Sequence, residues 1–278
     1  MAEPMKTHRI SPRLLEGPVK MLVVGAGGRG AAFASGLPYL HQAMRALGHP
    51  GGLKVTLADG DTVSESNCVR QPFSLHEVGR NKAEVLITRL NWFWGLDWSA
   101  SPHFVAADDE LTGYHIVVGC VDSRAARAML AESSRRAWSV VYWLDAGNGN
   151  DFGQVVLGEP RGGGGEMRLP TVAELLPDVV APGREEAGPS CSAAEALARQ
   201  APFTNHVLAY HMLYLLGQLF RHGELSHHGL FLNLAEGTTQ PIPVDPEQWA
   251  QMMADGPAVG GRGTTGASTP APLLPLAA

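Results

Sequence analysis

The chain has 278 residues, of which 45% are hydrophobic and 17% charged, and its formal net charge is −6. This length suffices for one large domain or for a domain with an appendage. A mildly acidic chain gives no reason to expect binding to nucleic acid or to anionic membranes. The three cysteines are Cys68, Cys120 and Cys191. They form no Cys-x-x-Cys pair, which excludes a four-cysteine zinc site and suits a reducing cytoplasm.

A glycine loop follows the first predicted strand. Residues 21–25 are a short apolar run that predicts a buried strand. A helix is expected after the loop, and Pro38 should break it or start a second helix. The loop glycines are Gly25, Gly27, Gly28 and Gly30. Glycines at such a turn let the backbone approach a phosphate, and the next helix offers free N–H groups. NAD, FAD, S-adenosylmethionine and ATP all bind in this way, so the motif alone leaves the ligand open.

Strands and helices alternate along the next part of the chain. The alternation predicts an α/β fold, a Rossmann-like, mainly parallel sheet with helices on both faces. Further strands are expected at 53–58, 104–106, 115–121, 140–144 and 152–157, and helices at 81–94 and 123–137. A long Gly/Pro-rich crossover loop with a helical turn near 172–176 should follow, and then C-terminal helices at 193–200 and 203–221.

These features predict four parts of the chain. They are an N-terminal extension (1–19), a nucleotide-binding core (20–158), the crossover loop, cysteine segment and C-terminal helices (159–253), and a disordered tail (254–278). No apolar stretch reaches the roughly 20 residues that a membrane span needs.

Polar residues typical of a triphosphate site follow the second strand. Asp59 ends that strand, where a carboxylate accepts hydrogen bonds from ribose hydroxyls. Arg70 and Lys82 can neutralise phosphates as pyrophosphate leaves, a demand that an NAD enzyme does not make. Asn67 can fix the loop or contact the nucleotide, and Asp122 follows a strand where it can hold Mg²⁺. Simpler interpretations are surface charges for Arg70 and Lys82 and a helix cap for Asp122.

Four motifs run in order within residues 20–158: Gly-x-Gly-Gly-x-Gly, Asp-x-Asp-x-Val-x-x-Ser-Asn-x-x-Arg-Gln, Gly-x-x-Lys-Ala and Cys-x-Asp. This order resembles ThiF, MoeB and the ubiquitin-activating enzymes. Further motifs resemble the ThiF-like component of PRTRC plasmid-type gene systems. They are Pro189-Ser-Cys-Ser, Pro202-Phe-Thr-Asn and the stretch from Pro241 to Trp249.

The resemblance implies ATP and Mg²⁺ as cofactors. By position, Asp59 would bind ribose and Asp122 magnesium, while Arg70, Lys82 and Asp122 would serve catalysis. The nucleotide would be lined by Gly25, Gly27, Gly28, Gly30, Asp59, Asp61, Asn67, Arg70 and Lys82. Arg29 stands where the family usually has an apolar residue.

The implied partner is a small ubiquitin-like or sulfur-carrier protein, whose C-terminal carboxylate would be adenylated. The resemblance also implies a homodimer, in which Arg9 or Arg13 is a candidate for completing the site of the other subunit. Two alternatives stay open: a nucleotide-binding scaffold of the same fold that has lost catalysis, and an NAD-dependent oxidoreductase, against which Arg70 and Lys82 argue.

Cys191 is a candidate nucleophile that would take the acyl group as a thioester. It directly precedes the capping box Ser192-x-x-Glu195, and a helix N-terminus favours the thiolate over the thiol. The segment also resembles the Pro-x-Cys-Thr segment of ubiquitin-activating enzymes. The alternative is a cysteine that packs beside the cap, the structural role that is expected of Cys68 and Cys120.

Overall fold

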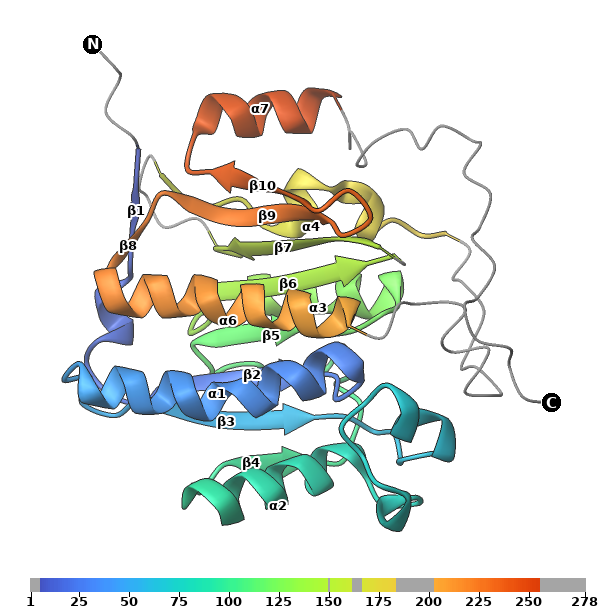
Figure 1. Ribbon diagram of the computed structural model, residues 1–278. Helices are drawn as coiled ribbons and strands as arrows, with labels where there is room; N and C mark the ends of the chain where they lie inside the picture. The colour runs from blue at the N-terminus through green and yellow to red at the C-terminus, as the bar shows by residue number, and fades with distance from the viewer. Residues whose placement is uncertain (1–5, 150, 162–166, 184–202, 256–278) are drawn as a thin grey trace.

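The computed structural model describes residues 6–149, 151–161, 167–183 and 203–255. Within them, an eight-stranded sheet has the order β10-β9-β7-β6-β5-β2-β3-β4 (Figure 1). Its strands are β2 (Val19–Val24), β3 (Leu53–Ala58), β4 (Ser99–Ser101), β5 (Ile116–Gly119), β6 (Tyr142–Asn148), β7 (Phe152–Gly158), β9 (His227–Asn233) and β10 (Thr238–Pro243). Strands β4, β3, β2, β5 and β6 are parallel, and β7, β9 and β10 extend the sheet in antiparallel fashion. The expected α/β fold with a mostly parallel sheet is therefore confirmed.

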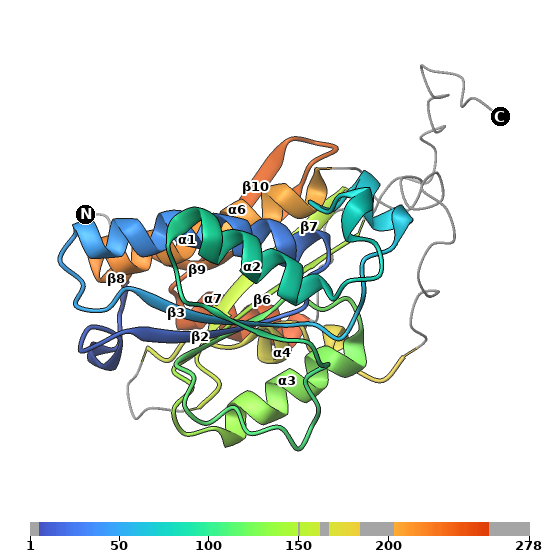
Figure 2. The ribbon, with the colours of Figure 1, turned by 90° about the horizontal axis from the view of Figure 1, so that it is seen from below.

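Helices cover both faces of this sheet (Figure 2). One face carries α1 (Gly28–Ala46), α2 (Lys82–Trp94) and α6 (Thr204–His222), and the other carries α3 (Arg124–Arg136) and α4 (Val172–Leu175). Helix α7 (Pro246–Asp255) follows β10 and contacts α4. Short 3-10 helices are η1 (Pro12–Leu14), η2 (Glu65–Val69), η3 (Leu75–Glu77) and η4 (Pro177–Val179), and β1 (His8–Arg9) pairs with β8 (Glu224–Leu225).

The central strands place the glycine loop at one edge of the sheet. Residues 21–24 of β2 and 116–118 of β5 are all buried, because helices cover both faces of the strands. The carboxyl ends of β3, β2, β5 and β6 therefore lie side by side at one edge, where ligands of open α/β sheets bind. In the part of the chain that the structure describes, no helix has the length and apolar character needed to cross a membrane.

Pro38 does not break the first helix, contrary to expectation. Helix α1 runs from Gly28 to Ala46 with Pro38 inside it. Proline removes one N–H donor and crowds the carbonyl four residues earlier, here that of Ala34. The helix continues because Leu37 and Pro38 are buried in the core and α1 packs along α6. Packing thus outweighs one lost hydrogen bond.

Two expectations about strands were wrong. The edge strand lies at Ser99–Ser101 rather than at 104–106, since Phe104 is 69% exposed and this apolar run does not join the sheet. After residue 159 only helices were expected, yet β9 and β10 form a hairpin on the sheet. Gly229 lets β9 approach β7, because a Cβ there would lie 2.4 Å from the Val155 carbonyl oxygen. The helix expected at 193–200 and the tail from residue 256 lie outside the described residues.

Candidate nucleotide site

The glycine loop joins β2 to α1 at the carboxyl edge of the sheet. Gly25 has a φ of +98°, and a Cβ there would lie 2.7 Å from the Cys120 carbonyl oxygen. A Cβ on Gly30 would lie 1.8 Å from the Gly25 carbonyl oxygen. At both positions the fold itself requires glycine.

Gly27 differs from its neighbours in the loop. It is the N-cap of α1 with an ordinary φ of −69°, and it provides no side-chain cap. Among the described residues, no heavy atom lies within 4 Å of the position that a Cβ would take. Neither backbone strain nor packing requires glycine here, so the missing side chain leaves room for a ligand beside the first N–H groups of α1. The loop therefore fits a phosphate group.

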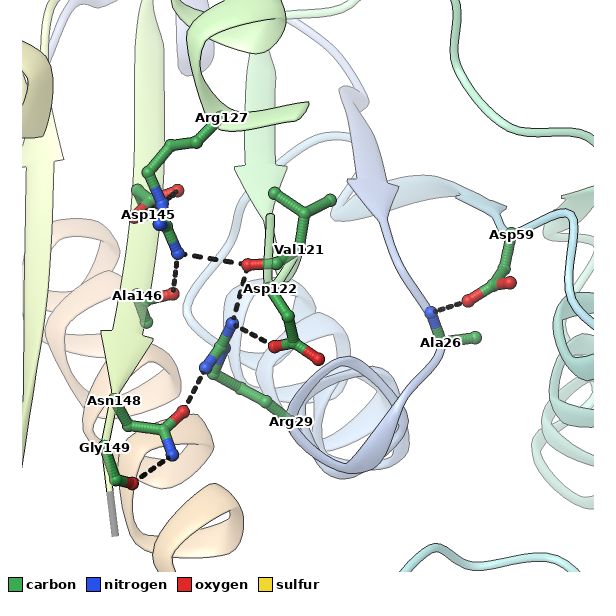
Figure 3. Close-up of polar contacts among 10 residues, drawn as sticks. All are labelled: Ala26, Arg29, Asp59, Val121, Asp122, Arg127, Asp145, Ala146, Asn148 and Gly149. Atoms are coloured by element: carbon green, nitrogen blue, oxygen red, sulfur yellow. Dashed lines mark hydrogen bonds and ion pairs between the residues drawn. The ribbon is translucent and has the colours of Figure 1, made fainter. Parts of the chain in front are cut away.

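Asp59 reaches the loop from the end of β3. Its Oδ2 accepts a hydrogen bond from the Ala26 N–H at 2.5 Å (Figure 3), and its Oδ1 accepts one from the Asp61 N–H at 2.7 Å. Burial raises the pKa of this carboxyl, and the two backbone donors act in the opposite direction. Each oxygen accepts one bond and keeps capacity for another, which is what a ribose diol needs.

Lys82 is buried at the start of α2, so its interpretation as a surface charge is wrong. Its Nζ lies 2.9 Å from the Asp61 Oδ2, and its backbone N–H donates to the Asp61 carbonyl. The Asn81 side chain donates to the carbonyls of both Asp59 and Asp61. These contacts tie the amino end of α2 to the residues that follow β3. An ammonium and a half-exposed carboxylate thus lie close to Asp59.

Asn67 has a structural contact in the loop between β3 and α2. Its Oδ1 accepts a hydrogen bond from the Ser64 N–H at 3.0 Å, which completes the capping box of η2. Arg70 is half-buried and follows this short helix directly, and its backbone N–H donates to the Asn67 carbonyl. Of the two roles considered for Asn67, fixing the loop is the one with a described contact.

Asp122 does not cap the helix that follows it. The cap of α3 is Ser123, whose Oγ accepts from the Ala126 N–H at 3.0 Å. The side chain of Asp122 is 99% exposed, and its described ionic contact is with Arg29 at 3.5 Å. A carboxylate three residues after the end of β5 is therefore available to a ligand. Within the described residues, no three His, Cys, Asp or Glu side chains form a metal cluster.

Two further residues border the loop and are not among the site residues predicted from the sequence. Arg29, noted only as a departure from the family pattern, is buried against Asp122 and Asn148 (Figure 3). Its charge within a loop of small residues was the available signal. Asn205 lies in the first turn of α6, and its Nδ2 lies 2.5 Å from where a Cβ on Gly28 would be. A local sequence pattern does not predict that Arg29 and Asn205 both border the loop, because they lie on different helices that are far apart in the sequence.

Other candidate residues lie elsewhere. Arg13 stacks over the ring of Trp138, which follows α3 at the edge opposite the glycine loop, and Arg9 lies in β1 beside α6. Cys120 is buried, which raises the pKa of its thiol to about 12, so it is an unreactive thiol. Cys191 lies outside the described residues, and its proposed chemistry stays a prediction.

Comparisons with known proteins find one family model that matches part of the chain. Residues 17–147 match the model of the ThiF family. No curated protein matches the chain. Among solved structures, selenomethionine PaaA matches with 16% identity and a TM-score of 0.55, over 84% of this chain and 65% of that one. Escherichia coli MccB with MccA-N7isoASN and MccB with ATP each match with 18% identity and a TM-score of 0.51, over 81% of this chain and 64% of those. The chain thus spans less than two thirds of these proteins, and the likeness to them shows the fold alone.

Proposed function

Because residues 17–147 match the model of the ThiF family, we propose that the chain belongs to this family and is an ATP-dependent adenylyltransferase. The family is typically one of adenylating enzymes that act on small carrier proteins or peptides. The observation that carries the proposal is Gly27, where glycine leaves space that no described residue uses. The solved structure of MccB with ATP has the same fold and supports ATP as the nucleotide.

The arrangement of charges favours ATP over NAD. The Asp59 carboxylate would take the ribose hydroxyls, and the N–H groups at the start of α1 would face the phosphates. Arg70 lies midway along the connection between β3 and α2, and Lys82 is the first residue of α2. Both would neutralise the departing pyrophosphate. Asp122 would hold Mg²⁺, which would neutralise phosphate charge. An NAD site has no pyrophosphate to release and needs neither cation.

The proposed reaction is acyl adenylation. A carboxylate oxygen of the acyl substrate attacks the α-phosphorus of ATP, and the bond from that phosphorus to the bridging oxygen of the β-phosphate breaks. Pyrophosphate leaves with the electron pair, and an acyl-adenylate remains. The role of this chain's residues is to align the α-phosphate and to stabilise the charge that develops on the leaving group.

As the acyl substrate we propose the C-terminal carboxylate of a small ubiquitin-like or sulfur-carrier protein, and as a following step a thioester on Cys191. The described residues on either side of the segment 184–202, which contains Cys191, support the second step. Gly183 lies against Arg124, close to Asp122 in the chain, and Asn205 lies against Gly28. Both flanks of the segment therefore border the site.

Two other functions would give different results. A scaffold that has lost catalysis would bind ATP without exchange, and an NAD-dependent oxidoreductase would bind NAD instead.

We also propose that the protein is a homodimer, since exposed aromatic side chains gather on α1, α2 and α6. We further propose that the protein belongs with the ThiF-like component of PRTRC gene systems, which its sequence motifs resemble.

The test is exchange of labelled pyrophosphate into ATP, with small proteins that end in glycine and are encoded beside the gene as acyl substrates. We expect exchange with one of them. Arg70→Ala should lower the exchange rate by about 10²–10³-fold, as loss of a donor at developing charge does. The control is Arg221→Ala, an exposed arginine at the far end of α6. NAD binding without ATP binding would refute the proposal, and ATP binding without exchange would favour the scaffold.

The same reaction mixtures test Cys191. On a non-reducing gel, the wild-type protein should show an adduct with the partner that reductant removes. Cys191→Ala should lose the adduct and keep pyrophosphate exchange. An adduct that persists in Cys191→Ala, or no adduct in the wild type, would show that the thioester step is wrong.

A further inference from the structure

Arg29 is a buried cation held in place in the first turn of α1. The residue is 3% exposed, although arginine is among the residues least often buried. Its Nη1 donates to the Asn148 Oδ1 at 2.5 Å, and its Nη2 donates to the Val121 carbonyl at 3.1 Å. These acceptors belong to β6 and to the residue before Asp122, so they hold the guanidinium at the carboxyl ends of β5 and β6 (Figure 3).

The partners of Arg29 leave its charge only partly neutralised. Asn148 and the Val121 carbonyl are uncharged, and the same carbonyl also accepts from Arg127 at 3.0 Å. The buried carboxylate of Asp145 forms its ion pair with Arg127, whose Nε lies 2.9 Å from it, and attracts Arg29 only as a second, weaker influence. Asp122 is the ion-pair partner of Arg29 in the structure, at 3.5 Å, and its side chain is almost fully exposed. Asp122 can therefore turn toward a ligand while Arg29 stays in place.

We propose that Arg29 is a built-in cation of the nucleotide site that takes over part of the role of the divalent metal. The proposal rests on the adenylating function and on the assignment of Asp122 to Mg²⁺. A fixed guanidinium attracts the phosphates whether or not metal is present, and it repels a metal ion held by Asp122. Both effects make nucleotide binding less dependent on metal than it would be with an apolar residue at this position.

The test measures the affinity of the full-length protein for a non-hydrolysable ATP analogue by calorimetry, once with saturating Mg²⁺ and once with EDTA. The quantity of interest is the dissociation constant in EDTA divided by the dissociation constant with Mg²⁺, so a higher ratio means stronger dependence on metal. Arg29→Gln should raise this ratio by about tenfold, an order of magnitude that follows from one unit charge several ångströms from the phosphates and the metal. Arg29→Lys, which keeps the charge, should stay close to the wild type.

Two further variants distinguish an effect of the Arg29 charge on the ratio from an effect of impaired folding. Arg45→Gln removes an arginine from the last turn of the same helix and should leave the ratio unchanged. Asn148→Asp leaves Arg29 intact and adds a carboxylate beside it, so it should raise the ratio as Arg29→Gln does. This second variant keeps the test decisive if Arg29→Gln does not fold.

The outcomes distinguish this inference from the proposed function. If the analogue binds and the ratio is the same in the wild type, Arg29→Gln and Asn148→Asp, then Arg29 does not share the role of the metal, while the adenylating function stands. A lower ratio in these variants would also overturn the inference, because Arg29 would then position Asp122 for the metal. If the wild type binds no nucleotide under either condition, both proposals fail.

Discussion

Gly27 and Gly30 lie in the same turn of chain, yet glycine serves a different purpose at each. At Gly30 a Cβ would overlap the Gly25 carbonyl oxygen, so the protein's own backbone forbids a side chain. At Gly27 no described atom would touch a Cβ. A family pattern treats the two glycines alike, whereas in the structure the fold requires only Gly30, and Gly27 leaves open space.

This difference predicts opposite effects of two alanine substitutions. Gly27→Ala should change the free energy of unfolding by less than about 1 kcal/mol, since only an N-cap preference is altered, and it should abolish nucleotide binding. Gly30→Ala should cost about 2 kcal/mol or more, because the backbone must move to admit the methyl group. Urea denaturation and calorimetry with an ATP analogue measure both effects. If Gly27→Ala kept full affinity for the analogue, the loop would not be the phosphate site.

At the scale of elements, the β9–β10 hairpin brings an ionisable group into the core. His228 of β9 is fully buried, and its Nδ1 lies 2.7 Å from the Leu157 carbonyl oxygen, so this nitrogen carries the proton. The ring packs against Trp249 of α7, with the ring centroids 5.2 Å apart. Burial lowers the pKa of His228 to about 4. The neutral imidazole therefore joins β7, β9 and α7.

The lowered pKa predicts acid sensitivity. Between pH 6.5 and 4 the unfolded chain binds a proton at His228 that the folded chain does not bind, so stability falls as the pH falls through this window. The loss should be on the order of 3 kcal/mol. In His228→Asn, which keeps a donor for Leu157 and does not titrate, the decrease should be smaller by this amount. Urea denaturation of both proteins at pH 7 and pH 4.5 measures this difference. Because the two proteins share all other titrating groups, the difference reports on His228 alone. Equal decreases would show that His228 does not titrate in this way.

At the scale of the whole molecule, one face of the sheet carries helices with unusually exposed aromatic side chains. They are Trp92 (87% exposed), Phe93 (73%), Tyr39 (67%), Tyr210 (62%) and Tyr214 (59%). They lie on α1, α2 and α6, the three helices that cover the same face (Figure 2). Apolar surface on this scale is typical of a face that binds another protein.

We expect this face to mediate self-association. Sedimentation velocity at micromolar concentrations should show a dimer for the wild type. The double variant Trp92→Gln/Phe93→Gln should be a monomer, because aromatic side chains contribute most to interface energy. Trp138→Gln, an exposed tryptophan that follows α3 on the other face, is the control and should stay dimeric. A wild-type monomer would refute the proposal, as would a dimer that the double variant leaves intact.

The sequence by itself determined the α/β core and the place of the glycine loop. Both depend on local order: apolar runs that end in glycine, helices between them, and polar residues that follow strands, such as Asp59 and Asp122. Because parallel strands align their carboxyl ends, these residues meet at one edge once the alternation of strands and helices is known. The motifs were therefore sufficient to predict the match of residues 17–147 to the ThiF family model and to nominate residues at that edge as a candidate nucleotide site.

Only the tertiary structure decided what depends on contacts between distant segments. The uninterrupted α1 depends on burial of Pro38, and the hairpin depends on the approach of Gly229 to Val155. In the same way, Arg29 became part of the site only where α1 meets Asn148 and Asp122. In each case the free energy comes from packing or charge across elements, and such terms outweigh the local preferences that a sequence pattern records.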